Sequence, residues 1–203
     1  MCFSAPASFI AGGGLVTLGV ASFAIAKKED KILAVIPIIF GVQQLIEGIQ
    51  WLNLNIGSLS IPAGYGFIFI ALIVWPIYVP IAVYFQDKRR RKFLKWFVFL
   101  GIAIALYFLF FLLTQTLHIN KFNSCIQYAF NFPFKDIASV VYLLSIFGPL
   151  FASDREIFKW FGVATAILAT IAEFYFLTTF TSVWCFFAAI VSSMFFVYLK
   201  FKK

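Results

Sequence analysis

The chain has 203 residues, of which 63% are hydrophobic and only 12% are charged, and its mean hydropathy is +0.99. A soluble domain is about 45–50% apolar and about 25% charged, so this composition excludes a soluble globular protein. The formal charge of +8 is concentrated in short connections between apolar segments. It therefore does not indicate a nucleic-acid-binding face.

Long apolar runs follow one another along the whole chain, separated by short polar breaks. A helix needs about 20 mostly apolar residues to cross roughly 30 Å of hydrocarbon. The runs are continuous, which favours helices over the alternating strands of a membrane barrel. We predict an all-α, polytopic bundle of about seven transmembrane helices in a single domain, residues 1–203, with helices at 7–26, 32–53, 62–85, 94–117, 136–152, 157–177 and 181–200.

The basic residues predict the orientation of these helices, because cytoplasmic loops collect Lys and Arg. All but two of the 16 Lys and Arg residues follow the first, third, fifth or seventh helix, the exceptions being Lys121 and Lys135. The N-terminus is therefore expected outside and the C-terminus in the cytoplasm. The run from Lys88 to Lys95 is expected to contact anionic lipid headgroups.

The first predicted helix has a packing face at helical spacing. It is formed by Ala7, Ala11, Gly14 and Leu18, with Gly12, Gly13 and Gly19 beside them. The connection from His118 to Lys135 is the longest of the chain. It is expected to lie along the outer surface, where it would cap the bundle.

A polar stripe runs along the second predicted helix. Gln43, Glu47 and Gln50 share one helical face, and Gln44 lies beside them. An ionisable group within a membrane helix costs roughly 2.5–3.5 kcal/mol on insertion scales, so it normally faces the bundle interior. Glu173 of the sixth helix falls in the same outer half. We expect the two carboxylates and the amides to line a shared, outward-facing ligand pocket.

The thiols and the single histidine also fall on the outer side of the predicted topology: Cys2, His118, Cys125 and Cys185. Cys, His and Glu are competent zinc ligands, and a Cys-rich site suits copper(I). No Cys-x-x-Cys or His-x-x-x-His spacing accompanies them. A metal site is one hypothesis. A disulfide between Cys2 and Cys125, with Cys185 as a buried apolar residue, is the other.

Three stretches of sequence resemble a family of uncharacterised bacterial seven-helix membrane proteins: the opening Met-Cys-Phe-Ser, the stretch from Phe40 to Trp51, and Ser182-Val-Trp-Cys. The resemblance covers most of the chain and implies a location in the bacterial inner membrane. It assigns no reaction. It marks six motif positions: Cys2, Gln43, Gln44, Glu47, Trp184 and Cys185.

The leading functional hypothesis is an outward-facing polar pocket that binds a metal ion, zinc or copper, or a small ligand, with hydrolysis by a metal-bound water or the Cys2 thiolate as a further step. The second is a small proton- or cation-coupled transporter or channel that uses the same carboxylates. The third is a membrane sensor or assembly subunit, which predicts no cavity. The sequence identifies neither the substrate nor the oligomeric state, and it leaves open whether the protein is an enzyme.

Overall fold

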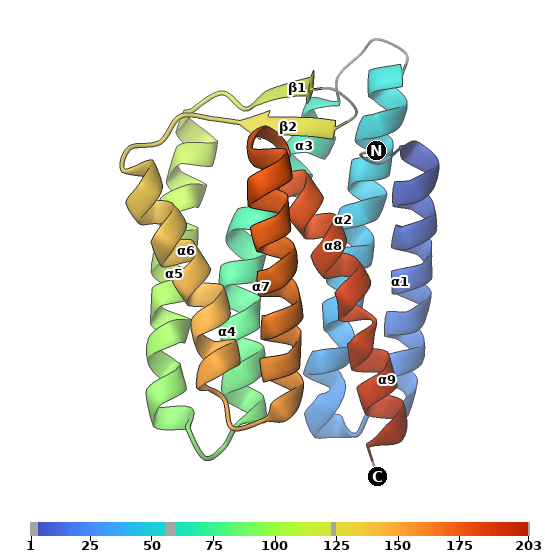
Figure 1. The fold of residues 1–203 in the computed structure, drawn as a ribbon, viewed down its shortest axis with the longest axis vertical. Coiled ribbons are helices and arrows are strands. Elements are labelled where there is room, and N and C mark those ends of the chain that lie inside the picture. The colour runs from blue at the N-terminus through green and yellow to red at the C-terminus, as the bar shows by residue number, and fades with distance from the viewer. Residues whose placement is uncertain (1–3, 56–59, 123–124, 203) are drawn as a thin grey trace.

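The computed structural model describes residues 4–55, 60–122 and 125–202. These form a bundle of long helices with one small hairpin across one end (Figure 1). The elements in chain order are α1 Ala5–Ile25, η1 Lys28–Asp30, α2 Lys31–Asn55, α3 Ile61–Phe69, η2 Ile70–Val74, α4 Trp75–Gln86, α5 Arg91–Thr114, β1 His118–Phe122, β2 Cys125–Ala129, α6 Lys135–Ala152, α7 Glu156–Phe176, η3 Leu177–Thr179, α8 Phe180–Ser192 and α9 Met194–Phe201.

Within the described residues, 6 helical segments are long and apolar enough to cross a membrane. The predicted helical architecture with several membrane-spanning segments is confirmed. The last of these segments, Glu156–Phe201, combines α7, η3, α8 and α9. The chain turns back at η3, so that α8 and α9 descend beside α7 (Figure 1). Helix α9 therefore ends at the end of the bundle opposite the hairpin, whereas α1 begins at the hairpin end.

The long connection expected to cap the bundle forms an antiparallel hairpin of β1 and β2 that lies across one end of the helices (Figure 1). Its register runs from the pair His118 and Ala129 to the pair Phe122 and Cys125. Ile119 and Ile126 are buried against the bundle, at 4% and 0% exposure. The hairpin is therefore held by its apolar side chains as well as by its ladder of backbone hydrogen bonds.

Helices α1 and α2 pack through glycine at very short range. A Cβ atom on Gly12 would lie 2.9 Å from the carbonyl oxygen of Gly41, and one on Gly41 would lie 2.8 Å from the backbone nitrogen of Val16. The packing face predicted through Ala7, Ala11 and Gly14 is displaced. The buried positions of α1 are Ala5, Ser8, Gly12, Leu15, Gly19 and Ser22, while a Cβ on Gly14 would meet nothing within 4 Å.

The closest backbone approach joins α4 and α5. Pro76 lies in the first turn of α4, and a Cβ atom added to Gly101 of α5 would sit 1.8 Å from the Pro76 carbonyl oxygen. No side-chain rearrangement relieves a clash with backbone. Only glycine therefore fits at position 101 with the two helices at this distance.

Gly101→Ala is expected to destabilise the protein by about 3 kcal/mol or more, because the helices must separate to admit the methyl group. The matched control is Gly13→Ala, since a Cβ on Gly13 would meet nothing within 4 Å. That control should be neutral or stabilising by up to about 1 kcal/mol, as alanine favours helix. Unfolding in mixed micelles measures both values. Equal stabilities for the two variants would contradict the close contact.

Candidate functional site

The polar stripe of α2 faces the interior of the bundle. Gln43, Gln44, Glu47 and Gln50 are each 0% exposed. Four fully buried polar side chains on one helix are expensive in an apolar bundle unless they find partners. Their hydrogen bonds therefore decide which helices lie beside α2.

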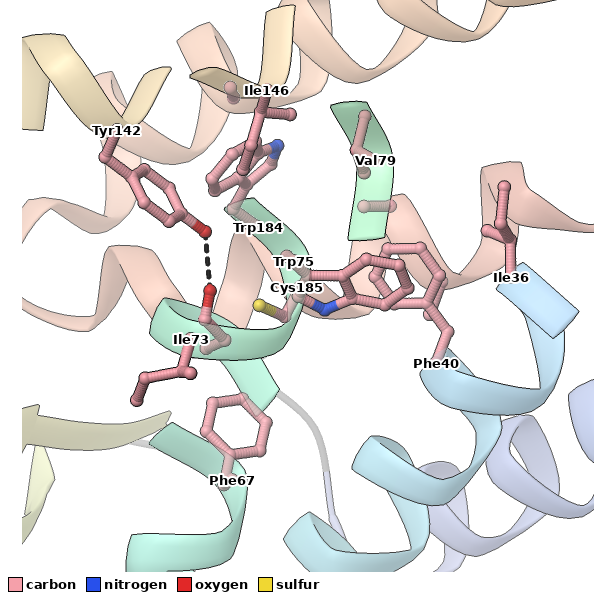
Figure 2. Close-up of a cluster of buried hydrophobic side chains, with 14 of the residues drawn as sticks. Ile36, Phe40, Phe67, Ile73, Trp75, Val79, Tyr142, Ile146, Trp184 and Cys185 are labelled. Atoms are coloured by element: carbon pink, nitrogen blue, oxygen red, sulfur yellow. Dashed lines mark hydrogen bonds between the residues drawn. The ribbon is translucent and has the colours of Figure 1, made fainter. Parts of the chain in front are cut away.

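Gln43 connects three helices. Its Oε1 atom accepts a hydrogen bond of 2.9 Å from Nε1 of Trp75 in α4, and its Nε2 atom donates to the Cys185 sulfur of α8 at 3.4 Å. The Trp75 ring also stacks on Phe40, with ring centroids 3.9 Å apart. Figure 2 shows Phe40, Trp75 and Cys185 within one group of buried side chains. This single amide fixes the middle of the bundle.

One turn further along α2, Glu47 makes the second contact with α8. The Ser182 hydroxyl donates a hydrogen bond to Oε1 of Glu47. Gln44 lies next to the same carboxyl group. Both amide atoms of Gln50 are buried with no hydrogen-bond partner among the described residues, whereas Gln44 interacts with the Glu47 carboxyl group. Buried polar atoms are rarely left unpaired, so Gln50 is an exception among the polar side chains of α2.

A cleft of about 720 Å³ lies between α6, α7 and α8 beneath the hairpin. Its walls are largely apolar, with aromatic rings from α6 and α8 and small residues from α7. Trp184 and Cys185 of α8 form part of its lining, together with Tyr128 of β2. Small-molecule sites commonly have volumes of about 300–1,000 Å³, so the cleft is large enough for a ligand.

Hydrogen bonds and ring contacts hold the inner wall of the cleft in place. Trp184 donates from Nε1 to the carbonyl oxygen of Thr165 at 3.3 Å and stacks on Phe180 at 5.3 Å between centroids. Tyr142 donates to the carbonyl oxygen of Ala71 at 2.7 Å. Ala71 belongs to η2, a π-helical turn within the third span. Figure 2 shows Tyr142 and Trp184 side by side at this wall.

Two carboxylates line the hairpin end of the cleft. Asp136 lies in the first turn of α6 and Glu173 in the last turn of α7. Both side chains are exposed. The cleft thus has an acidic, hydrated end and an apolar interior.

The structure separates the two glutamates that were expected to share a pocket. Glu173 lines the cleft, whereas Glu47 does not. Glu47 contacts α8 from the side of α2, through Ser182. Only Glu173 and Trp184 of the predicted ligand residues line the cleft directly.

The geometry does not support the zinc or copper site predicted from Cys2, His118, Cys125 and Cys185. His118 and Cys125 occupy opposite ends of the hairpin register, and Cys185 is a buried free thiol. No group of three or more His, Cys, Asp or Glu side chains in the described part of the chain could hold a metal ion. Cys125 is disulfide-bonded. Cys2 lies outside the described residues, so its pairing with Cys125 stays a prediction.

The family model for DUF6629, described as a family of unknown function, matches residues 1–203. The chain belongs to this family. The predicted resemblance to an uncharacterised family is therefore confirmed, while its bacterial origin and its seven helices stay predictions. No curated protein and no solved structure matches the chain.

Tyr128 lines the cleft, although the sequence did not indicate it as a site residue. Its ring stacks on Phe67 at 4.7 Å, and its buried hydroxyl has no hydrogen-bond partner among the described residues. Burial raises the pKa of the Tyr128 phenol well above its ordinary value, and the nearby Glu47 and Cys185 raise it further. The sequence feature that could have indicated Tyr128 is its spacing of two residues from Ile126, because residues i and i+2 of a strand lie on the same face.

Asp136 and Ser182 were also missed, for different reasons. Asp136 lies at a helix end, where an acidic residue favours the positive end of the helix dipole and needs no functional explanation. Ser182 is one hydroxyl among several in the seventh apolar segment. Its contact with Glu47 spans 135 positions of sequence, so no local pattern indicates it.

Proposed function

We propose that this chain is a membrane protein with seven crossings that binds a small amphiphile with a cationic head in the cleft between α6, α7 and α8. The observation that carries the proposal is the cleft of about 720 Å³, with apolar walls and the carboxylates of Asp136 and Glu173 at one end. The amphiphile's tail would occupy the apolar interior, and its ammonium head would lie at the acidic end.

The seven crossings follow from dividing the last apolar segment at η3. Helix α7 has 21 residues, and α8 with α9 covers Phe180–Phe201. At 1.5 Å per residue each spans roughly 30 Å, enough for one crossing. The basic run from Lys88 to Lys95 connects α4 and α5 at the end opposite the hairpin, which supports a cytoplasmic position for that end. We place the protein in the bacterial inner membrane, with the hairpin outside.

The chemistry of the cleft favours an amphiphile over a fully polar ligand. Phe147, Phe180 and Trp184 supply aromatic surface for a hydrocarbon tail. The carboxylates of Asp136 and Glu173 attract a cation, and hydrogen bonds from an ammonium group to a carboxylate are stronger than neutral ones. Both carboxylates remain exposed, so the free protein pays little desolvation cost for them.

The α2 stripe has a positioning role in this proposal. Gln43 forms a hydrogen bond with Cys185, and Glu47 forms one with Ser182. Two side chains of α2 therefore hold α8 in position. Trp184 lies between these two anchored residues and faces the cleft. Gln44 and Gln50 complete the stripe beside Glu47. The cleft itself counts against the sensor or assembly hypothesis, which predicts no cavity.

The topology is tested by cysteine labelling in membrane vesicles of known orientation. Single cysteines replacing Lys88 and Asn120, both exposed, should react from opposite sides with a membrane-impermeant maleimide. Lys88→Cys should be labelled from the cytoplasm and Asn120→Cys from outside. Labelling of both from one side would refute an odd number of crossings between α4 and the hairpin.

The ligand class is tested by quenching of Trp184 fluorescence with a bromine-tipped dodecyltrimethylammonium, added to protein in phosphatidylcholine nanodiscs. Wild type should show saturable quenching, and Trp184→Phe should lose that component. The double variant Asp136→Asn with Glu173→Gln should bind about three- to tenfold more weakly, because each exposed ion pair contributes about 0.2–1 kcal/mol. A bromine-tipped dodecanoate should bind wild type more weakly than the cation does.

Glu156→Gln is the matched control for this experiment. Glu156 is an exposed acid at the other end of α7, paired with Lys159 at 2.8 Å, and its loss should leave quenching unchanged. Equal affinity for the cationic and anionic probes, or quenching that does not saturate, would refute the proposed site.

A second candidate function, a proton-coupled transporter, is favoured by the fully buried Glu47 carboxyl group and the buried amides of Gln44 and Gln50 beside it on α2. In that case proteoliposomes carrying wild type should dissipate an imposed pH gradient, and Glu47→Gln should slow the flux at least about tenfold because it removes the titrating group. Glu29→Gln, an exposed acid elsewhere, serves as the control. The absence of flux in wild type would exclude this function while leaving amphiphile binding untouched.

A further inference from the structure

A second cavity, of about 660 Å³, lies at the end of the bundle opposite the hairpin, around the turn between α4 and α5. Basic side chains dominate its lining, and Arg89 and Arg90 are among them. Lys88, Arg91, Lys92 and Lys95 also line it. Basic side chains this close together repel one another, and nearby negative charge reduces that repulsion.

A buried carboxylate fixes the backbone of this turn. Oδ1 of Asp87 accepts hydrogen bonds from the backbone N–H groups of Arg89 at 3.0 Å and Arg90 at 3.1 Å. Its Oδ2 atom accepts from the Ser153 hydroxyl at 2.9 Å and the Asp154 N–H at 2.8 Å. Burial raises the pKa of Asp87, but these four hydrogen bonds lower it by more, so its pKa lies below the ordinary value. The turn is therefore rigid before any ligand arrives.

The start of α5 carries more positive charge than Asp87 and Asp154 offset. Its N-cap residue, Arg90, makes no side-chain capping hydrogen bond, and its first turn contains no acidic residue. Instead that turn begins with Arg91 and Lys92. A helix N-terminus carries partial positive charge and favours anions by about 0.3–1 kcal/mol each, so basic residues there are disfavoured by similar amounts. A bound anion would remove this conflict.

Only part of the positive charge is neutralised by the protein. Arg89 and Arg90 pair with Asp154, at 3.6 Å and 2.7 Å. Among the described residues, no ion pair includes Lys88, Arg91, Lys92 or Lys95.

Arg91 is oriented by aromatic rings rather than by a counter-ion. Its guanidinium lies 4.9 Å from the Tyr84 ring centroid. Its Nε atom is buried and has no hydrogen-bond partner among the described residues. The side chain as a whole is only partly buried and lines the cavity. The planar N–H donors of a guanidinium match phosphate oxygens.

We propose that this cavity binds the phosphate of an anionic phospholipid from the adjacent leaflet. Arg91 and the N-terminus of α5 would hold the phosphate oxygens, and Lys88, Lys92 and Lys95 would surround them. The flanking aromatic side chains favour a lipid over a soluble phosphate, since Phe85, Phe93 and Trp96 are 55%, 55% and 63% exposed and offer apolar surface to acyl chains. This site is independent of the cleft at the hairpin end.

The test compares lipid retention and thermal stability in nanodiscs of pure phosphatidylcholine and of phosphatidylcholine with phosphatidylglycerol. Native mass spectrometry of wild type should show retained phosphatidylglycerol, and its melting temperature should be higher in the mixed nanodiscs. Arg91→Gln should reduce retention about tenfold. Arg91→Lys should give an intermediate value, because lysine keeps the charge but loses the planar pair of N–H donors. The gain in melting temperature on adding phosphatidylglycerol should be smaller in the Arg91 variants than in wild type, whatever their melting temperatures in pure phosphatidylcholine.

Lys28→Gln is the matched control, because Lys28 is an exposed cation outside this cavity, and it should leave retention unchanged. Equal losses in Lys28→Gln and Arg91→Gln would overturn the proposal in favour of diffuse surface charge. If Arg91→Gln does not fold, the double variant Lys92→Gln with Lys95→Gln must show the loss. In a parallel experiment, inorganic pyrophosphate is added to protein in pure phosphatidylcholine nanodiscs. If pyrophosphate raises the melting temperature and phosphatidylglycerol has no effect, the proposal that the ligand is a lipid is overturned.

Discussion

The Gln43 amide joins α2, α4 and α8, and the arrangement of the bundle depends on it. In an apolar environment helices gain little from burying apolar surface against one another, so interhelical hydrogen bonds and close packing decide which helices meet. Gln43 uses both ends of its amide, accepting from Trp75 and donating to Cys185. Glu47 adds a second bond to α8 through Ser182. The helix held by these two contacts is the one that presents Trp184 to the cleft.

Glycine supplies the other half of this packing. Gly12 and Gly41 bring α1 against α2, and Gly101 brings α5 against the Pro76 carbonyl of α4. The bundle is therefore compact where backbones meet at glycine. It widens between α6 and α7 near the hairpin, where the cleft lies.

The two proposed sites have opposite charge and lie at opposite ends of the bundle. Carboxylates line the cleft at the hairpin end, and basic side chains line the cavity around the turn between α4 and α5. Each site combines charge with adjacent aromatic surface, which is the chemistry of an amphiphile or a lipid rather than of a soluble metabolite. A protein with both would bind a cationic amphiphile at one membrane surface and an anionic headgroup at the other.

The sequence by itself determined the features that depend on local composition and period. Segment length and hydropathy predicted helices able to cross a membrane, and the spacing of Gln43, Glu47 and Gln50 predicted a stripe that the structure buries. Both are properties of a single helix, which a linear pattern records.

Only the tertiary structure decided which side chains meet. It placed Glu47 against Ser182 of α8 and Glu173 in the cleft, because neighbouring helices fix the rotation of each helix about its axis. It separated His118 from Cys125 through a strand register that helical reasoning did not include. The contact face of α1 likewise follows from the position of Gly41 on α2. Contacts between distant segments depend on three-dimensional packing, and a linear pattern carries no information about it.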